Sequence, residues 1–520
     1  MKKIFSFLLV CTFSLTVYSQ ENEIVPIKFI QNGFVSLDYV SAKMTLNRFG
    51  NPEINMGLTG IHYNLLLNKS LYTGLGFYGA VNGERGGFFT LGVNLGIKKQ
   101  ITEKLFIDSG LHFGGGGGAS TPDGGGAFIL PHVNLGYQFK NFSTTLGYSY
   151  INFFDKGNIT STQFRLGIQI PLSYNYANFH NREKSFSVEN LKETKWNQFS
   201  KRISLKLQMD NLSPYGDSQF TDFKSLKGKT IRLAGFEIAS YLTNNWFVYF
   251  RADGAFHGIR GGYMDLFIGG GYKFYFNKNR TNILTKFAIG AGGGGGLDSG
   301  GGFLIYPDIS IEQKLFDDIY LSINKGYLLN PNQHFTSSTL GFGLKYYVNQ
   351  QGIKQKSNTF YSSAKFKGLE ISFGQEMYFD AKRDKLNGVL IPTENLHQLA
   401  LQLNLFITKN IYLAGHTSFA NFGNAGAYAE GIVGFGYLTN TLLNNKVQIF
   451  AQVLAGAAGG GMISTGQGLI FKPSIGFNYR LNNKLSFKTS LGKVKARVGS
   501  LNSTSLNFGL NYRISFLTAN

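Results

Sequence analysis

Several kinds of residue are scarce in this sequence, and their scarcity excludes whole classes of protein. Cys11 is the only cysteine, so the chain beyond residue 20 can form no disulfide, zinc–thiolate site or cysteine nucleophile. Charged residues make up 15% of the chain, against roughly 25% in an ordinary soluble domain, while aromatic residues also reach 15%. That balance excludes intrinsic disorder. No stretch after residue 20 approaches the ~18 consecutive apolar residues of a membrane-spanning helix, which excludes a helical membrane protein.

Glycine and positive charge are both in excess. Glycine accounts for 67 of the 520 residues, well above the roughly 7% that is usual. These glycines cluster and do not recur at every third position, so the chain is not a collagen. Lys and Arg number 50 against 29 Asp and Glu, which gives a net charge of +21. We interpret this charge as attraction to anionic lipid. Nucleic acid is not an expected partner, because the exported chain has no folded binding motif.

The first nineteen residues have the pattern of a secretory signal peptide. Lys2 and Lys3 precede an apolar stretch that runs to Val17, and Ser19 stands at the −1 position of a cleavage site. A lipoprotein signal ending at Cys11 is the alternative, but the residue before that cysteine is not small. We expect the chain to be exported.

The remainder of the chain repeats itself three times. Residues 71–86, 246–261 and 411–426 align without gaps, and a glycine run follows each of these segments. The predicted organisation is a signal peptide at 1–19, units at 34–174, 202–349 and 368–517, and linkers at 175–201 and 350–367.

Each unit has the pattern of eight long β-strands. Apolar residues occupy every second position from Phe164 to Tyr174, and polar or small residues fill the positions between them. In the first unit the fourth run covers 87–98 and the seventh covers 142–154. Short turns alternate with longer loops, which is typical of transmembrane barrels. The predicted fold class is therefore all-β, a transmembrane antiparallel up-and-down β-barrel.

The chain combines a predicted signal peptide, alternating strands with paired short turns, and the closing strand FGLNYRISF. This combination resembles the small eight-stranded outer-membrane β-barrel proteins of gram-negative bacteria. The resemblance implies an outer-membrane location, and it implies outer-membrane lipid, lipopolysaccharide and the outer-membrane assembly machinery as partners. One departure is that such barrels often end on an aromatic residue, whereas four residues follow Phe516 here.

The 24 strands could close as three small barrels or as one large barrel. The inward positions of the fourth strand in the second unit include Tyr263, Asp265 and Phe267. Bulky side chains of this kind suit a narrow packed interior, whereas a wide barrel holds water. We therefore favour three tandem eight-stranded units, and a single 24-stranded barrel is the alternative.

The glycine runs carry no phosphate-binding signature, because no Lys-Ser or Lys-Thr pair and no helix follows them. Glycine within a strand usually marks a bend or a close backbone approach. We interpret the runs as barrel curvature and surface loop. The alternative is a face without side chains on which units dock or a lipid chain lies.

His416, Ser418 and Glu430 form the one weak catalytic candidate. They resemble the His-x-Ser pair and Glu of outer-membrane lipid A deacylases, in which a histidine base activates a serine. Phe419 stands where that family has an asparagine, and alternation turns His416 and Ser418 toward the interior. A buried polar network is therefore the favoured interpretation. We predict no catalytic residue, no cofactor and no metal site, and we do not expect an enzyme.

Two further sets of charged residues are candidates for contact or binding. Arg251, Asp253 and Asp265 are predicted to form an ion-pair network in the lumen of the second unit. Arg85 and Arg260 lie in the similar sequences GERGG and GIRGG on the long-loop side. Because arginine binds phosphate bidentately, they are candidates for lipopolysaccharide phosphate binding. For Arg85 and Arg260, a solvated surface charge is the favoured interpretation.

The predicted function is an integral outer-membrane protein with a structural, surface-interaction or lipid- and lipopolysaccharide-binding role. The first alternative is a transport pore formed by a single 24-stranded barrel. The second alternative is a lipid A-modifying acyl hydrolase.

Overall fold

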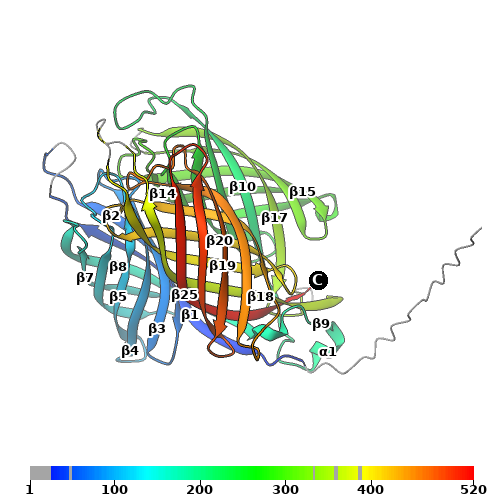
Figure 1. Ribbon diagram of the computed structural model, residues 1–520. Helices are drawn as coiled ribbons and strands as arrows, with labels where there is room; N and C mark the ends of the chain where they lie inside the picture. The colour runs from blue at the N-terminus through cyan, green and yellow to red at the C-terminus, as the bar shows by residue number, and fades with distance from the viewer. Residues whose placement is uncertain are drawn as a thin grey trace, which may run out of the picture.

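The computed structural model describes residues 25–45, 50–331, 334–355, 361–384, 389 and 391–519 (Figure 1). The predicted signal peptide at 1–19 lies outside the described residues. Antiparallel β-strands make up most of the described chain. Within those ranges, no helix has the length and the apolar character needed to cross a membrane.

The first eight strands form a closed ring. β1 pairs with β2 along one edge and with β8 along the other, and each strand between them pairs with its neighbours in sequence. We call this the first ring. Its strands are β1 (Phe29–Ala42), β2 (Met56–Leu66), β3 (Leu71–Asn82), β4 (Phe89–Gln100), β5 (Leu105–Gly117), β6 (Phe128–Gln138), β7 (Ser143–Phe153) and β8 (Thr160–Asn178).

Eight more strands form the second ring, which closes through the pairing of β10 with β17. Its strands are β10 (Lys201–Tyr215), β11 (Ile231–Tyr241), β12 (Trp246–His257), β13 (Met264–Phe276), β14 (Thr281–Gly293), β15 (Phe303–Phe316), β16 (Ile319–Leu328) and β17 (Thr336–Gln350).

The third ring closes through the pairing of β18 with β25. Its strands are β18 (Ser363–Ala381), β19 (Glu394–Phe406), β20 (Ile411–Phe422), β21 (Ala429–Leu438), β22 (Val447–Gly459), β23 (Leu469–Arg480), β24 (Leu485–Ala496) and β25 (Asn502–Ala519). The architecture is thus an all-β antiparallel barrel fold. Because the first and last strands of each set pair with each other, the pairings do not describe one ring of 24 strands.

The alternation of side chains sets the character of the two faces of each ring. On β8 the outward side chains are apolar and open, with Phe164 63% exposed and Leu166 54% exposed. The inward side chains between them are polar and covered, and Arg165 is only 7% exposed. Exposed apolar surface that continues around a ring is far larger than a soluble monomer tolerates. An apolar exterior of this kind is suited to contact with lipid.

The two ends of the rings differ. In the first ring, short connections at 67–70, 101–104 and 139–142 lie at one end, which we call the short-turn end. Longer connections such as 118–127 and 154–159 lie at the other, which we call the loop end.

The rings meet at the loop end through three equivalent contacts, which we call seams. In the first seam, between the first and second rings, the Gly86 N–H donates to the Gly300 carbonyl at 2.7 Å. In the second seam, between the second and third rings, Gly261 donates to Gly466 at 2.9 Å. In the third seam, between the third and first rings, Gly426 donates to Gly124 at 3.1 Å. Each ring therefore offers a turn to one neighbour and a glycine-rich loop to the other.

The glycine runs allow these close approaches. A Cβ atom added at Gly87 would overlap the backbone of Gly293 and Gly294 in the second ring, and one added at Gly115 would overlap the Ala420 carbonyl of the third ring. The runs thus form docking faces between rings, which was the alternative interpretation of their sequence. Below the seams, an apolar cluster joins the three rings, with the Phe77 and Phe419 rings 6.2 Å apart and Ala291 beside them.

The segment between the first and second rings is packed against neighbouring elements. The segment predicted as the first linker contains η1 (Phe179–Asn181), β9 (Ser185–Ser187) and α1 (Val188–Lys192), and η2 (Asn277–Asn279) lies in a short turn of the second ring. β9 pairs with the start of β18. The buried Trp196 donates its Nε1–H to the Pro26 carbonyl at 2.8 Å and packs against Phe366. Leu517 joins the same cluster, so the chain end closes over the short-turn end.

Candidate functional site: the charged interiors of the rings

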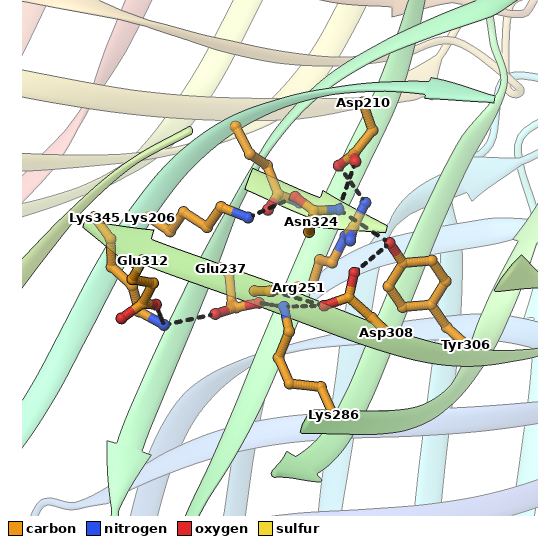
Figure 2. A network of polar contacts seen from close by, with 12 residues as sticks. Lys206, Asp210, Glu237, Arg251, Lys286, Tyr306, Asp308, Glu312, Asn324 and Lys345 are labelled. Carbon is orange, nitrogen blue, oxygen red and sulfur yellow. Dashed lines mark hydrogen bonds and ion pairs between the residues drawn. The ribbon is translucent and has the colours of Figure 1, made fainter. Parts of the chain in front are cut away.

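The second ring contains a buried column of ion pairs (Figure 2). In its lower part, toward the short-turn end, Lys286 Nζ lies 2.9 Å from Glu237 and 2.8 Å from Asp308. Lys345 Nζ lies 3.3 Å from the other oxygen of Glu237 and 2.9 Å from Glu312. Glu237 therefore bridges two lysines, and each lysine bridges two carboxylates.

The upper part of the column is organised around Arg251. Its guanidinium donates to Asp210 at 2.7 Å and also to Asp253. The Asn324 amide donates to Asp210 at 2.9 Å and its oxygen accepts from Lys206 at 2.9 Å. These side chains come from strands on several sides of the ring, so they converge in its interior (Figure 2).

Tyr306 connects the two parts of the column. Its hydroxyl donates to Asp308 at 3.2 Å and lies 3.5 Å from the Asn324 amide nitrogen. The guanidinium carbon of Arg251 lies 4.5 Å from the centre of the Tyr306 ring. The polar contacts consequently run without a break from Glu312 near the short-turn end to Asp253 higher in the ring.

The residues of the predicted lumen network, Arg251, Asp253 and Asp265, are all buried in the second ring. Arg251 and Asp253 lie in direct contact. Asp265 lies opposite Asp253 on the neighbouring strand, and it accepts a hydrogen bond from Tyr263 at 2.9 Å. Arg251 makes its second ion pair with Asp210 instead.

The third ring holds a compact cluster around Lys472. Its ammonium lies 2.7 Å from Glu376, 2.7 Å from Glu430, 3.1 Å from His416 Nε2 and 3.0 Å from the Tyr378 hydroxyl. The candidate residues His416 and Glu430 are thus brought together, with His416 Nε2 3.2 Å from the Glu430 carboxylate. Both side chains are buried.

The Ser418 hydroxyl is not hydrogen-bonded to His416. Its hydroxyl donates to Gln398 Oε1 at 2.6 Å. A serine nucleophile needs its hydroxyl within reach of the base that deprotonates it. The observed arrangement is a buried polar network, and it lacks the serine–histidine contact of a hydrolase.

The same cluster is the one group of metal-ligand type found among the described residues. Ligand atoms of Glu376, His416 and Glu430 lie within 4.8 Å of one another. The ammonium of Lys472 stands between both carboxylates and the imidazole, in the position that a metal ion would need. The group therefore already holds a cation that belongs to the chain.

The interior of the first ring is built around two carboxylates. Asp38 pairs with Arg165 at 2.5 Å and with His62 at 3.1 Å. Asp108 accepts from the Tyr72 hydroxyl at 2.8 Å. A cavity of about 10 Å³ lies among these side chains. That space holds about one water molecule.

The two arginines predicted to bind phosphate are engaged by the chain itself. Arg85 is 3% exposed and forms a bidentate pair with Glu53 at 2.8 and 2.7 Å. It also donates to the carbonyls of Ala119 and Ser120 at 2.9 and 2.8 Å. Arg260 is exposed, and it pairs with Asp384 of the third ring at 3.2 Å.

Asp123, which lies in a loop outside the strands, has a shifted pKa. Burial raises the pKa of Asp123 to about 6, although hydrogen bonds from the Gly118 N–H and the Thr121 hydroxyl oppose the shift. Asp123 lies in the loop between β5 and β6, at the glycine-rich side of the third seam.

Much of the column was missed by sequence reasoning, although a signal was present. Lys206, Gln208 and Asp210 occupy alternate positions of β10 and are all buried. Lys286 and Glu237 likewise occupy inward positions of strands whose other positions face outward. Applying the alternation rule to every strand would have found them, but the pairing partners depend on ring closure.

Comparisons with known proteins found only distant similarity. No family model and no curated protein matches the sequence. Among solved structures, a ferric enterobactin receptor mutant from Pseudomonas aeruginosa in complex with enterobactin is 8% identical, with TM-score 0.27 over 92% of this chain and 81% of that one. The siderophore receptor PirA from the same species is 8% identical, with TM-score 0.25 over 94% and 81%. OpdQ, also from Pseudomonas aeruginosa, is 7% identical, with TM-score 0.21 over 94% and 98%. Assignments for this chain therefore rest on its own residues.

The predicted structural, surface-contact or lipopolysaccharide-binding role requires correction. Arg85 and Arg260 are its candidate phosphate-binding residues, and the Arg85 guanidinium pairs with Glu53 and donates to the carbonyls of Ala119 and Ser120. A purely structural barrel also gives no reason for the column around Lys286, because well-packed apolar residues often match or exceed the stability of a buried ion pair.

Proposed function

We propose that the protein transports small ions across the outer membrane through the polar interiors of its rings. The observation that supports this proposal is the unbroken column of ion pairs in the second ring, from Glu312 through Lys286 and Asp308 to Arg251. Charged groups in a membrane-spanning interior are costly to keep there, and they characterise ion and proton pathways.

In this proposal the ion pairs hold the pathway closed. Lys286 lies between two carboxylates, those of Glu237 and Asp308, in the interior of the ring (Figure 2). Movement of this side chain toward one partner frees the other carboxylate for a passing cation. The rearrangement exchanges one ion pair for another, so it avoids the cost of about 3–5 kcal/mol for stranding a buried charge.

We also infer that the chain consists of three tandem eight-stranded barrels in one polypeptide, each with its own interior. The aligned segments 71–86, 246–261 and 411–426 support this, because they correspond to the third strand and following turn of each ring. The apolar outer faces support a location in the outer membrane, reached through a signal peptide.

The test is conductance of the full mature chain in planar lipid bilayers. We expect brief, infrequent conducting events from the unmodified protein. Lys286→Met should lengthen these events and favour cations, because Glu237 and Asp308 lose their shared partner. Lys325→Met is the matched control, because Lys325 is exposed on the outside of β16.

Folding is checked on each variant by the different migration of heated and unheated samples in gels. Folded Lys286→Met that conducts no better than a protein-free bilayer would overturn the proposal. Equal effects of the Lys286 and Lys325 substitutions would also overturn it, because conduction would then not depend on the column.

A further inference from the structure

The three seams are equivalent by position, but the second seam differs in what fills it. In the third seam, Phe154 of the first ring packs edge-on against Phe422 of the third ring, with centroids 6.2 Å apart. The neighbouring Asp155 accepts from the Gly423 N–H at 2.8 Å. This seam is closed by an aromatic pair and an acid.

The second seam has basic residues at the matching positions. Gap-free alignment of the repeats places His257 where Phe422 stands. Strand pairing places Arg497 where Phe154 stands, because Ile470 pairs with Ala496 as Phe128 pairs with Phe153. By the same register, Val498 replaces the acid Asp155. The second seam therefore has two basic side chains where the third seam has an aromatic pair beside an acid.

A second substitution opens the seam. Gly301 of the first seam and Gly125 of the third seam both lie against the backbone of the neighbouring ring, and a Cβ on Gly301 would come within 2.8 Å of Asn82 Cα. The corresponding residue of the second seam is Gln467, which carries a full side chain. Its Oε1 accepts from the Gly258 N–H at 3.4 Å.

A cavity of about 130 Å³ lies at this place in the second seam. Phe256, Leu469 and Val498 supply apolar walls, while His257, Arg497 and Thr465 supply polar groups. Of the described residues that line the cavity, none is acidic. Arg497 is exposed, and its guanidinium has no hydrogen bond or ion pair to another described residue.

The walls of the cavity are held by backbone contacts on both sides of the seam. Gly261 donates to Gly466 at 2.9 Å, and the Arg497 N–H donates to the Leu469 carbonyl at 2.9 Å. The cavity is therefore a feature of the docked rings.

We propose that this cavity is a binding site for a small organic anion, a carboxylate attached to a flat apolar body. The unpaired guanidinium of Arg497 suits the carboxylate bidentately, and His257 lines the same cavity. The apolar walls take the body of the ligand. The site is independent of the proposed ion conduction, because it lies between two rings and outside their interiors.

The test uses the full chain in detergent micelles and sodium benzoate as the probe, with binding measured by calorimetry against empty micelles. We expect benzoate to bind, and Arg497→Gln to weaken binding by about tenfold or more, because a charge-assisted hydrogen bond is lost. Gln467→Gly should also weaken it by closing the seam. Arg480→Gln is the matched control, because Arg480 ends β23 at the short-turn end.

Acetate and inorganic phosphate separate the two parts of the proposal. Acetate should bind about tenfold more weakly than benzoate, because it lacks the apolar body. The proposal is overturned if the unmodified protein binds no benzoate at millimolar concentration, or if Arg497→Gln binds it as well as Arg480→Gln does. Phosphate binding equal to benzoate binding would also overturn it, because the apolar walls would then have no part in recognition.

Discussion

The ammonium of Lys472 lies 2.7 Å from Glu376 and 2.7 Å from Glu430, so one tethered cation holds two carboxylates together inside the third ring. The second ring uses the same arrangement at Lys286, between Glu237 and Asp308. A lysine shared by two acids on different strands ties the opposite walls of a ring to each other. Its removal takes a partner from two carboxylates at once, although Glu237 keeps its pair with Lys345.

Lys472→Met should strongly destabilise the third ring. We expect a loss of about 3–5 kcal/mol, the usual cost of removing one partner from a buried ion pair. The measurement is the temperature at which the full chain loses its compact form on a gel. Zinc should restore part of this loss in Lys472→Met, because Glu376, His416 and Glu430 are then free to bind it. No response to zinc, or an equal response after His416→Gln is added, would contradict this reading.

Gly459→Val should open the second seam and leave the rings intact. A Cβ at Gly459 would overlap the backbone of Gly261 and Gly262 in the neighbouring ring. We expect faster hydrogen exchange of the amides at 258–262 and unchanged protection within the strands. Gly431→Val is the matched control, because nothing lies within 4 Å of a Cβ placed there. Similar exchange in both variants would show that the glycine run has no docking role.

The loop that contains Asp123 should be most stable at low pH. Its folded pKa of about 6 lies above the ordinary 3.8, so folding favours the protonated form. The stabilisation is fully present below pH ~4 and is lost as the pH rises through 6. The protection factors of the amides in residues 118–126, which are corrected for the base-catalysed intrinsic rate, should therefore fall over this range. Asp123→Asn should flatten the profile, and the exposed Asp222→Asn should not.

Arg85→Gln should affect stability and leave lipopolysaccharide binding unchanged. The substitution strands the buried Glu53 and removes the donors to two loop carbonyls, so we expect a loss of about 3 kcal/mol. Arg260→Gln breaks a largely exposed pair and should cost less than ~1 kcal/mol. Thermal midpoints test the predicted losses of stability, and binding to immobilised lipopolysaccharide tests the prediction that binding is unchanged. Weaker binding by folded Arg85→Gln would restore the original prediction.

Sequence alternation predicted the strands well because each residue of a half-buried strand carries its own signal. The fourth run was expected at 87–98 and β4 spans Phe89–Gln100, while the seventh was expected at 142–154 and β7 spans Ser143–Phe153. Both runs lie between turns whose residues are visible in the sequence.

Features that depend on contacts between distant parts of the chain were not visible. Arg85 lies in a glycine-rich turn that looks solvated, and its burial comes from Glu53 and from the loop at 119–120. The partners of Lys286 come from positions 49 residues earlier and 22 residues later. Such pairs follow from the closure of a ring, and periodicity within one strand contains no information about them.

The three seams have one more consequence. A head-to-tail interface between identical subunits repeats every substitution around the whole ring. Here each seam is encoded separately, so one junction is free to diverge while its two counterparts keep their original fit. Gln467 and Arg497 could enter the second seam without disturbing Gly125 or Phe154 in the third. Because the three rings belong to one chain, a single seam can acquire a specialised site. A homotrimer would acquire the same site at all three of its interfaces.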